Sequence, residues 1–132
     1  MIEEIEHTAD WAIHVRGRDL AELFTRAAQG MYALVTDLAR VRPLVERKVN
    51  LESFDAETLL VDWLSELLWY TESEGLVFSQ FEVHEITPTR LQATVQGEVV
   101  SNLEKQIKAV TFHNLVIRRT GEGYEVTIVF DV

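Results

Sequence analysis

The sequence predicts an α+β domain built as a two-layer sandwich, with two helices packed on one face of a largely antiparallel sheet. Three observations support this fold class. Apolar and polar residues alternate with period 2 at residues 5–15 and 45–51, as they do in half-buried strands. Two other segments repeat apolar residues at three- and four-residue spacing, as helices do, and after residue 76 only strand patterns recur. We expect residues 1–132 to form a single domain, because this length suits one hydrophobic core.

The first predicted strand region lies near the N-terminus. Mostly apolar residues occupy the odd positions from Ile5 to Val15. A break is expected near His7–Asp10, which would divide the region into two strands. The segment Val45–Leu51 alternates in the same way, with Arg47 as the one charged residue on its inner side.

Each predicted helix begins at an aspartate. Asp19 can accept hydrogen bonds from the first turn, and Glu22 stands where a capping box needs a carboxylate. The second helix runs from Asp55 to about Glu74, because its apolar pairs recur every four residues. Gly75 follows as a natural left-handed end.

Beyond the second helix the sequence predicts only strands. Pro88 and the glycines at 121 and 123 supply turns between them. In the third candidate strand the apolar phase shifts, which suggests a bulge around His113–Asn114. Ser101–Gln106 is a polar connector with at most one helical turn. The strand candidates are Leu76–Ile86, Arg90–Val99, Ile107–Arg118 and Tyr124–Asp131.

The charge balance restricts the partners. Twelve Lys and Arg residues stand against 22 Asp and Glu, which gives a formal net charge of −10 and a pI near 4.8. Binding to nucleic acid depends on clustered basic residues that displace counterions. We therefore expect no direct binding to nucleic acid, and a basic protein partner or a divalent cation suits this surface better.

The composition also excludes several kinds of site. There is no cysteine, so disulfides, thiolate metal sites and cysteine nucleophiles are excluded. The first residues, MIEEIEH, lack the features of a signal peptide. No apolar run approaches the roughly 18 residues needed to span a bilayer. We expect a cytoplasmic protein without a membrane segment.

The last residues form a candidate cation site. If Phe130 points into the core, Asp131 points outward, and the free α-carboxylate of Val132 follows one residue later. Two neighbouring negative groups repel each other unless a hard cation or a basic partner lies between them. Ca²⁺ and Mg²⁺ bind carboxylate oxygens of this kind. The alternative reading is a frayed, solvated end of the chain.

Asp10 is a candidate third ligand for the same cation. It stands inside an apolar alternation, near the expected strand break. It can join Asp131 and Val132 only if the first strand lies beside the last. The alternative reading is an aspartate that caps a turn.

The other polar residues form no catalytic set. The histidines at positions 7, 14, 84 and 113 lack zinc-site spacing, and no serine lies in a G-x-S-x-G motif. No glycine-rich phosphate loop is present. His113 is interpreted as a hydrogen-bonded structural residue, and Lys105 and Lys108 as solvated side chains that could also reach an anion. The residues alone therefore predict an acidic domain with one cation site and no catalytic residues.

Four motifs make the chain resemble the archease family. They keep the family's order and extend over nearly the whole sequence. The motifs are His7-Thr-Ala-Asp10 followed by Trp11-Ala-Ile13, Leu59-Leu-Val-Asp-Trp-Leu-Ser-Glu-Leu-Leu68, Ile107-Lys-Ala-Val-Thr-Phe-His-Asn-Leu115, and Phe130-Asp-Val132.

The resemblance implies a non-enzymatic activator of the GTP-dependent 3′-phosphate RNA ligase of the RtcB family. This ligase joins RNA ends in tRNA splicing and RNA repair, and its activators promote guanylylation and multiple turnover. The resemblance further implies a surface metal site made by Asp10, Asp131 and Val132, with Ca²⁺ as the expected cation. It implies the ligase as protein partner, and it leaves the roles of His7, Lys108 and His113 open.

Two other functions stay open at this point. The same carboxylates could serve a small metal-dependent phosphohydrolase, although two-metal phosphoryl chemistry usually needs more than three carboxylates. Alternatively, the protein is a general chaperone-like binding module whose cation is only structural.

Overall fold

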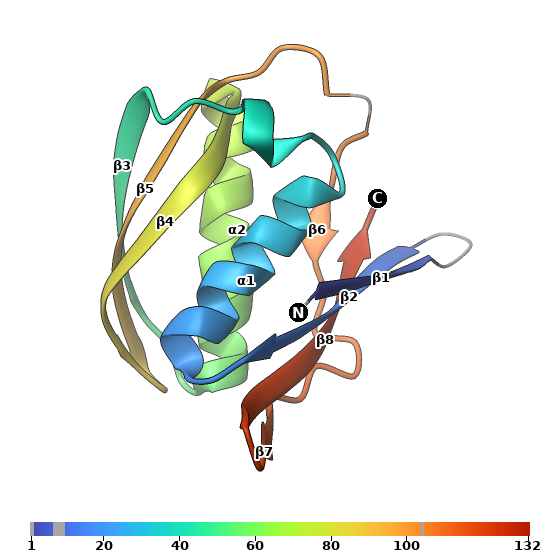
Figure 1. Ribbon diagram of the computed structural model, residues 1–132, viewed down its shortest axis with the longest axis vertical. Helices are drawn as coiled ribbons and strands as arrows, with labels where there is room; N and C mark the ends of the chain where they lie inside the picture. Colours follow the sequence, from blue (N-terminus) through green and yellow to red (C-terminus); the bar gives the residue numbers. More distant parts are fainter. Residues whose placement is uncertain (1, 7–9, 104) are drawn as a thin grey trace.

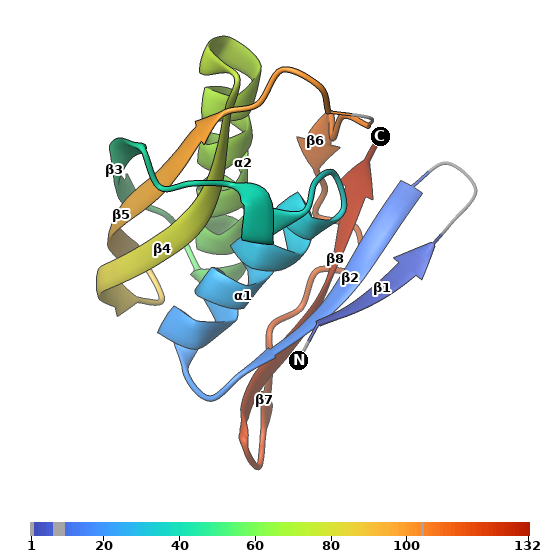
Figure 2. The same cartoon turned by 45° about the horizontal axis from the view of Figure 1, so that its top comes forward.

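Two antiparallel sheets enclose a layer of two α-helices (Figures 1 and 2). The computed structural model describes residues 2–6, 10–103 and 105–132, with side chains from residue 11 onward within these ranges. Both helices contact strands of each sheet, so the order of the layers is sheet, helices, sheet. Among the described helices, none is long and apolar enough to cross a membrane.

The first sheet joins the two ends of the chain. Its strand order is β1-β2-β8-β6, and β7 pairs with β8 beyond the end of β6. All pairs are antiparallel. Strand β8 therefore lies in the interior of the sheet, with β2 on one side and with β6 and β7 on the other. The strands are β1 (Ile2–Glu6), β2 (Asp10–Gly17), β6 (Ala109–Val110), β7 (Arg118–Thr120) and β8 (Gly123–Asp131).

The second sheet comes from the middle of the chain. Its order is β3-β5-β4, again antiparallel, with β3 (Val45–Glu52), β4 (Leu76–Thr87) and β5 (Arg90–Val99). The edge strand β4 carries two register shifts, between Phe78 and Gln80 and between Val83 and Glu85. Irregularities of this kind twist an edge strand and discourage pairing with another chain.

The two helices begin and end where local hydrogen bonds predict. Helix α1 covers Leu20–Ala33, and the Asp19 carboxylate accepts from the backbone N–H of Glu22 at 2.8 Å. Helix α2 covers Ala56–Glu74, and the Asp55 carboxylate accepts from the backbone N–H of Thr58 at 2.8 Å. Gly75 ends α2 with φ of 71°. A short 3₁₀ helix, η1 (Leu38–Arg40), lies between α1 and β3.

Buried hydrogen bonds connect the helices to each other. Trp63 of α2 is fully buried, and its Nε1–H donates to the carbonyl oxygen of Phe24 in α1 at 3.0 Å. The hydroxyl of Tyr32 donates to the carbonyl oxygen of Leu67 at 3.1 Å and lies 2.8 Å from Thr71 Oγ1. Burial raises the pKa of the Tyr32 hydroxyl well above its usual value, so this group stays neutral. The middle layer is therefore held by polar contacts as well as by apolar packing.

The predicted fold class is confirmed, while two details of the arrangement differ. The strands form two sheets instead of one, so the helices lie between sheets instead of on an outer layer. The alternation in a sequence identifies a strand but not its partner, and this explains the difference. The segment Ile107–Arg118 is also not one continuous strand: only β6 and β7 pair within it.

A turn replaces the bulge expected at residues 113–114. Asn114 has φ of 51°, a left-handed conformation that asparagine tolerates better than most residues. Val110 and Leu115 are both buried, although they belong to opposite phases of the alternation. The chain therefore leaves the sheet after β6 and returns at β7. The described residues of the connector Ser101–Gln106 contain no helix. Strand β1 ends at Glu6 and β2 begins at Asp10, and residues 7–9 of the predicted break lie outside the described residues.

Candidate metal site where the two ends of the chain pair

The register between β2 and β8 brings Asp10 and Asp131 to the same position of the sheet. Their Cα atoms are partners, and the next pair along the strands is Trp11 with Phe130. In an antiparallel pair, directly opposed residues lie on the same face, with Cβ atoms about 4.5–5.5 Å apart. The condition set by the sequence, that the first strand region lies beside the last strand, is met at these two positions.

Strand β6 holds the other side of the same position. Ala109 is the register partner of Asp131, and the backbone N–H of Lys108 donates to the carbonyl oxygen of Asp131 at 2.8 Å. Two residues before Asp131 in β8, the carbonyl oxygen of Val129 accepts from both the backbone N–H and the hydroxyl of Thr111, each at 3.0 Å. The end of β8 is thus fixed from two sides.

The core contacts decide which face Asp131 occupies. Phe130 is fully buried, and the exposed Asp131 therefore lies on the face turned away from the helices. Val132 is half-buried and packs against the edge of the core. Asp131 is consequently presented to solvent on a rigid strand.

The chemistry of this donor set suits a hard cation. Carboxylate oxygens are the ligands that Ca²⁺ and Mg²⁺ prefer, and no sulfur or imidazole is needed. Among the side chains that the structure describes, no three His, Asp or Glu residues are close enough to form a metal site, and the side chain of Asp10 is not among them. The fit therefore depends on the backbone register of Asp10 and on the exposure of Asp131.

A lysine near this end of the sheet has a partner that the sequence did not reveal. Lys105 Nζ lies 4.6 Å from the centroid of the Trp11 ring, a cation–π contact. Trp11 is the neighbour of Asp10 in β2. Lys105 was expected to be solvated; it is exposed, and it also covers the buried Trp11. The sequence carried no signal for this contact, because the two residues lie 94 positions apart and Lys105 belongs to a loop.

His14 and His113 have partners other than Asp131. His14 Nδ1 lies 2.9 Å from Thr127 Oγ1, and its Nε2 lies 3.4 Å from Glu125 Oε2, farther along the outer face. His113 Nε2 lies 3.3 Å from Nδ2 of its neighbour Asn114, and the His113 backbone N–H donates to Thr111 Oγ1 at 3.3 Å. The expectation of a hydrogen-bonded His113 is met in this weak form, and His7 lies outside the described residues.

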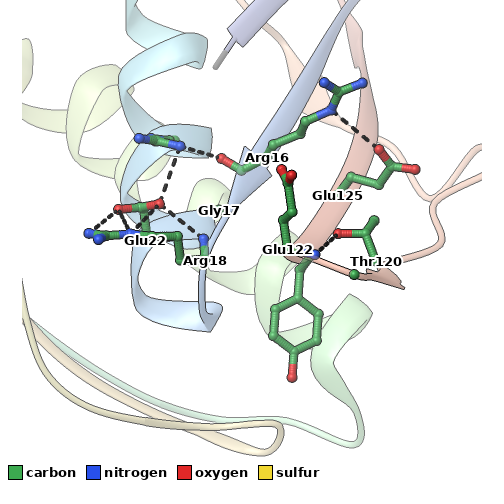
Figure 3. A pocket seen from close by; sticks show the side chains of 10 residues that line it. Arg16, Gly17, Arg18, Glu22, Thr120, Glu122 and Glu125 are labelled. Atoms are coloured by element: carbon green, nitrogen blue, oxygen red, sulfur yellow. Dashed lines mark hydrogen bonds and ion pairs between the residues drawn. The ribbon is translucent and has the colours of Figure 1, made fainter.

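The opposite ends of β2 and β8 border a pocket of about 560 Å³ (Figure 3). Its arginines are paired with glutamates. Arg18 contacts Glu22 at 3.0 Å, and Arg26 contacts the same carboxylate at 3.3 Å. Arg16 contacts Glu125 at 3.4 Å. The sequence did not predict this cluster.

In these pairs the positive charges of the arginines and the negative charges of the glutamates balance one another within the pocket. The backbone N–H and the guanidinium of Arg18 lower the pKa of Glu22, so this carboxylate stays charged. Arg26 also donates to the carbonyl oxygen of Arg16 at 2.9 Å. The cluster therefore ties the start of α1 to the end of β2, which is a structural role.

Comparison with known proteins adds a family. The sequence model of the archease protein family (MTH1598/TM1083) matches residues 2–132. Protein archease of Methanosarcina acetivorans is 38% identical over 138 residues, which cover 98% of this chain and 94% of the relative. Protein archease of Sulfurisphaera tokodaii is 35% identical, with 98% of this chain and 97% of the relative covered.

Solved structures show the same fold. The solution structure of Methanobacterium thermoautotrophicum protein 1598 superposes with a TM-score of 0.81 at 31% identity, over 99% of this chain and 98% of the other. The crystal structure of an archease from Thermotoga maritima, described as a possible chaperone, superposes with a TM-score of 0.71 at 22% identity. That match covers 98% of this chain and 96% of the other, and it concerns the fold alone.

Proposed function

The chain belongs to the archease family, and we propose that it activates a GTP-dependent 3′-phosphate RNA ligase of the RtcB family without catalysing a reaction itself. The resemblance described above implies this role in tRNA splicing and RNA repair. The net charge of −10 supports a basic, RNA-binding protein as the partner, because opposite charges speed encounter.

The pairing of Asp10 with Asp131 is the observation that carries the proposal. We propose that these carboxylates, with the carboxyl group of Val132, hold one divalent cation, Ca²⁺ in the first place. A cation bound there would supply a compact positive charge that groups of a second protein can also contact. The protein's part is to hold Asp131 still on a strand that is hydrogen-bonded on both sides.

The activating step follows from this placement. A carboxylate exposed at the end of a strand that is hydrogen-bonded on both sides, as Asp131 is, can bind one arrangement of a basic ligase loop better than others. Such differential binding shifts the ligase towards the state that accepts the guanylyl group. No bond is made or broken by this chain, which agrees with the absence of a catalytic set in the sequence.

The direct test measures ligase guanylylation and RNA joining with and without this protein. Asp10→Asn and Asp131→Asn are expected to abolish stimulation, while their melting temperatures in chelator stay within a few degrees of the wild type. Glu82→Gln is the matched control, because Glu82 is an exposed strand carboxylate opposite Thr94 in the other sheet. Full stimulation by both aspartate variants would overturn the proposal.

The same experiment separates the alternatives. A phosphohydrolase would turn over a nucleotide or phosphoester alone, in the presence of a divalent cation. For a binding module with a structural cation, a chelator would lower the melting temperature and leave ligase stimulation intact at temperatures where the protein stays folded. The first result would replace the activator proposal, and the second would remove the cation from the activating mechanism.

A further inference from the structure

Helix α2 turns an acidic face with an exposed tryptophan towards solvent. Trp69 is 57% exposed, although Trp63 on the same helix is fully buried. Leu67 is buried and precedes Trp69 by two residues; at about 100° per residue, these two side chains lie on nearly opposite sides of the helix. The residues on the outward side, called here the Trp69 face, are Asp62, Ser65, Glu66, Trp69, Glu72 and Ser73.

The charge of this helix has one sign. Its 19 residues include five carboxylates and no lysine or arginine. Within the described part of the chain, Asp62, Glu66 and Glu72 form no ion pair, and Asp62 accepts a hydrogen bond from the Ser53 hydroxyl at 2.6 Å. Among the described residues, the carboxylates of the Trp69 face are therefore not paired, although Lys105 lines the same small pocket as Glu72.

The position of Glu72 is unfavourable for the isolated helix. It lies in the last turn of α2, which contains no basic residue. A carboxylate near a helix C-terminus opposes the helix dipole, so it costs stability. A basic partner that covers both Glu72 and the exposed ring of Trp69 would relieve this cost.

The ring of Trp69 has an aromatic neighbour on its own helix. Its centroid lies 5.1 Å from that of Tyr70, in an edge-to-face arrangement. Tyr70 in turn contacts Arg47, whose guanidinium pairs with Glu74 at 2.8 Å. A side chain that is already ordered loses less entropy when it is buried at an interface.

From these observations we propose that the Trp69 face is a docking surface for a basic protein segment that stacks an arginine or lysine on Trp69. The charge favours this occupant, because Glu66 and Glu72 lie three residues before and after Trp69 on the helix, and a cation gains from both the ring and the carboxylates. Under the proposed function, on which this inference rests, the segment belongs to the ligase. The Trp69 face then supplies affinity, and the paired aspartates supply activation.

The test measures the affinity of the full chain for the RtcB-type ligase. Trp69→Ala is expected to weaken binding by at least about tenfold, as central aromatic contacts do. Glu66→Gln with Glu72→Gln is expected to weaken binding at low salt and to flatten its salt dependence. Phe54→Ala is the control, since Phe54 is 89% exposed but lies before α2, outside the Trp69 face.

Two further readouts separate docking from activation. At saturating concentration the Trp69→Ala variant should reach the wild-type level of guanylylation, whereas Asp131→Asn should not at any concentration. The other two tryptophans are buried, so docking should shift wild-type fluorescence to the blue and leave the Trp69→Phe spectrum unchanged.

The outcomes distinguish the two proposals. If the wild type binds and stimulates the ligase but Trp69→Ala binds equally well, the docking surface is overturned and the proposed function stands. If the wild type neither binds nor stimulates the ligase, both fail. If Trp69→Ala abolishes self-association in sedimentation and leaves ligase affinity unchanged, the occupant is a second copy and the basic segment is refuted.

Discussion

Replacing one of the two paired aspartates should make the protein more stable than the wild type without calcium and less stable than the wild type with calcium. Like charges directly opposite each other on antiparallel strands destabilise the pair by roughly 0.2–1 kcal/mol. Asp131 stands opposite Asp10 in the register of β2 and β8. Without divalent cations, Asp131→Asn should therefore stabilise the protein, because it removes this repulsion and keeps the shape of the side chain.

The expected change in melting temperature follows from the chain length. Unfolding entropy is about 2.1 cal/mol/K per residue, so a chain of 132 residues has about 0.28 kcal/mol/K. The gain in chelator should be about 1–4 °C. At a calcium concentration about 100 times the dissociation constant, binding stabilises the wild type by about 2.7 kcal/mol, or roughly 10 °C. The variant should gain little, so the order of the two melting temperatures reverses.

Scanning calorimetry in chelator and in a calcium titration measures both effects. The double variant Asp10→Asn with Asp131→Asn should be no more stable in chelator than either single variant, because each single substitution already removes the whole repulsion. Adding 1 M salt should shrink the gain in chelator. A variant that melts below the wild type in chelator, or that responds to calcium as the wild type does, would refute the reasoning.

Two further predictions concern the scaffold. A Cβ atom at Gly97 would meet the backbone of the neighbouring strand β4 well inside van der Waals contact, whereas one at Gly121 meets nothing within 4 Å. Gly97→Ala should therefore cost about 1–3 kcal/mol in denaturant unfolding, while Gly121→Ala stays within about 0.5 kcal/mol, and equal stabilities would contradict this packing. Hydrogen bonds from the Arg47 side chain lower the pKa of Glu74, and those from Arg42, mainly its backbone N–H, lower the pKa of Glu98. A lowered pKa in the folded state contributes stability that is complete above the unfolded value and is lost as pH falls through the folded value. Unfolding midpoints should accordingly drop below about pH 4.5, less so in the double variant Glu74→Gln with Glu98→Gln, and an equal drop would show that other groups control the acid limb.

The sequence predicted well those features that depend on neighbouring residues. Asp19, Asp55 and Gly75 mark helix ends through bonds that span only a few positions, and all three lie where expected. The strand pairing was harder, because it joins distant residues. The Ile107–Arg118 segment shows the reason: Ile107 and Leu115 are buried, but they reach the core from loops instead of a strand.

Only part of the candidate site could be predicted from the sequence. The aspartates could be chosen from residue type and position in an alternating pattern, while their adjacency is a property of the β2–β8 register. The Lys105–Trp11 contact and the outward Trp69 face depend on three-dimensional packing. A helical periodicity shows which side of α2 is buried, but not which side chains of other elements lie beside its outward side.

In our proposal, the pairing of β2 with β8 also determines when the molecule can bind its cation. Strand β8 enters between β2, made at the beginning of synthesis, and β6, made shortly before it. Contacts between residues so far apart in sequence form slowly, because a long loop must close first. A nascent or truncated chain that lacks residues 123–131 holds Asp10 without its counterpart, so in our proposal it cannot bind the cation. Activation of the ligase would then be restricted to molecules whose synthesis and folding are finished.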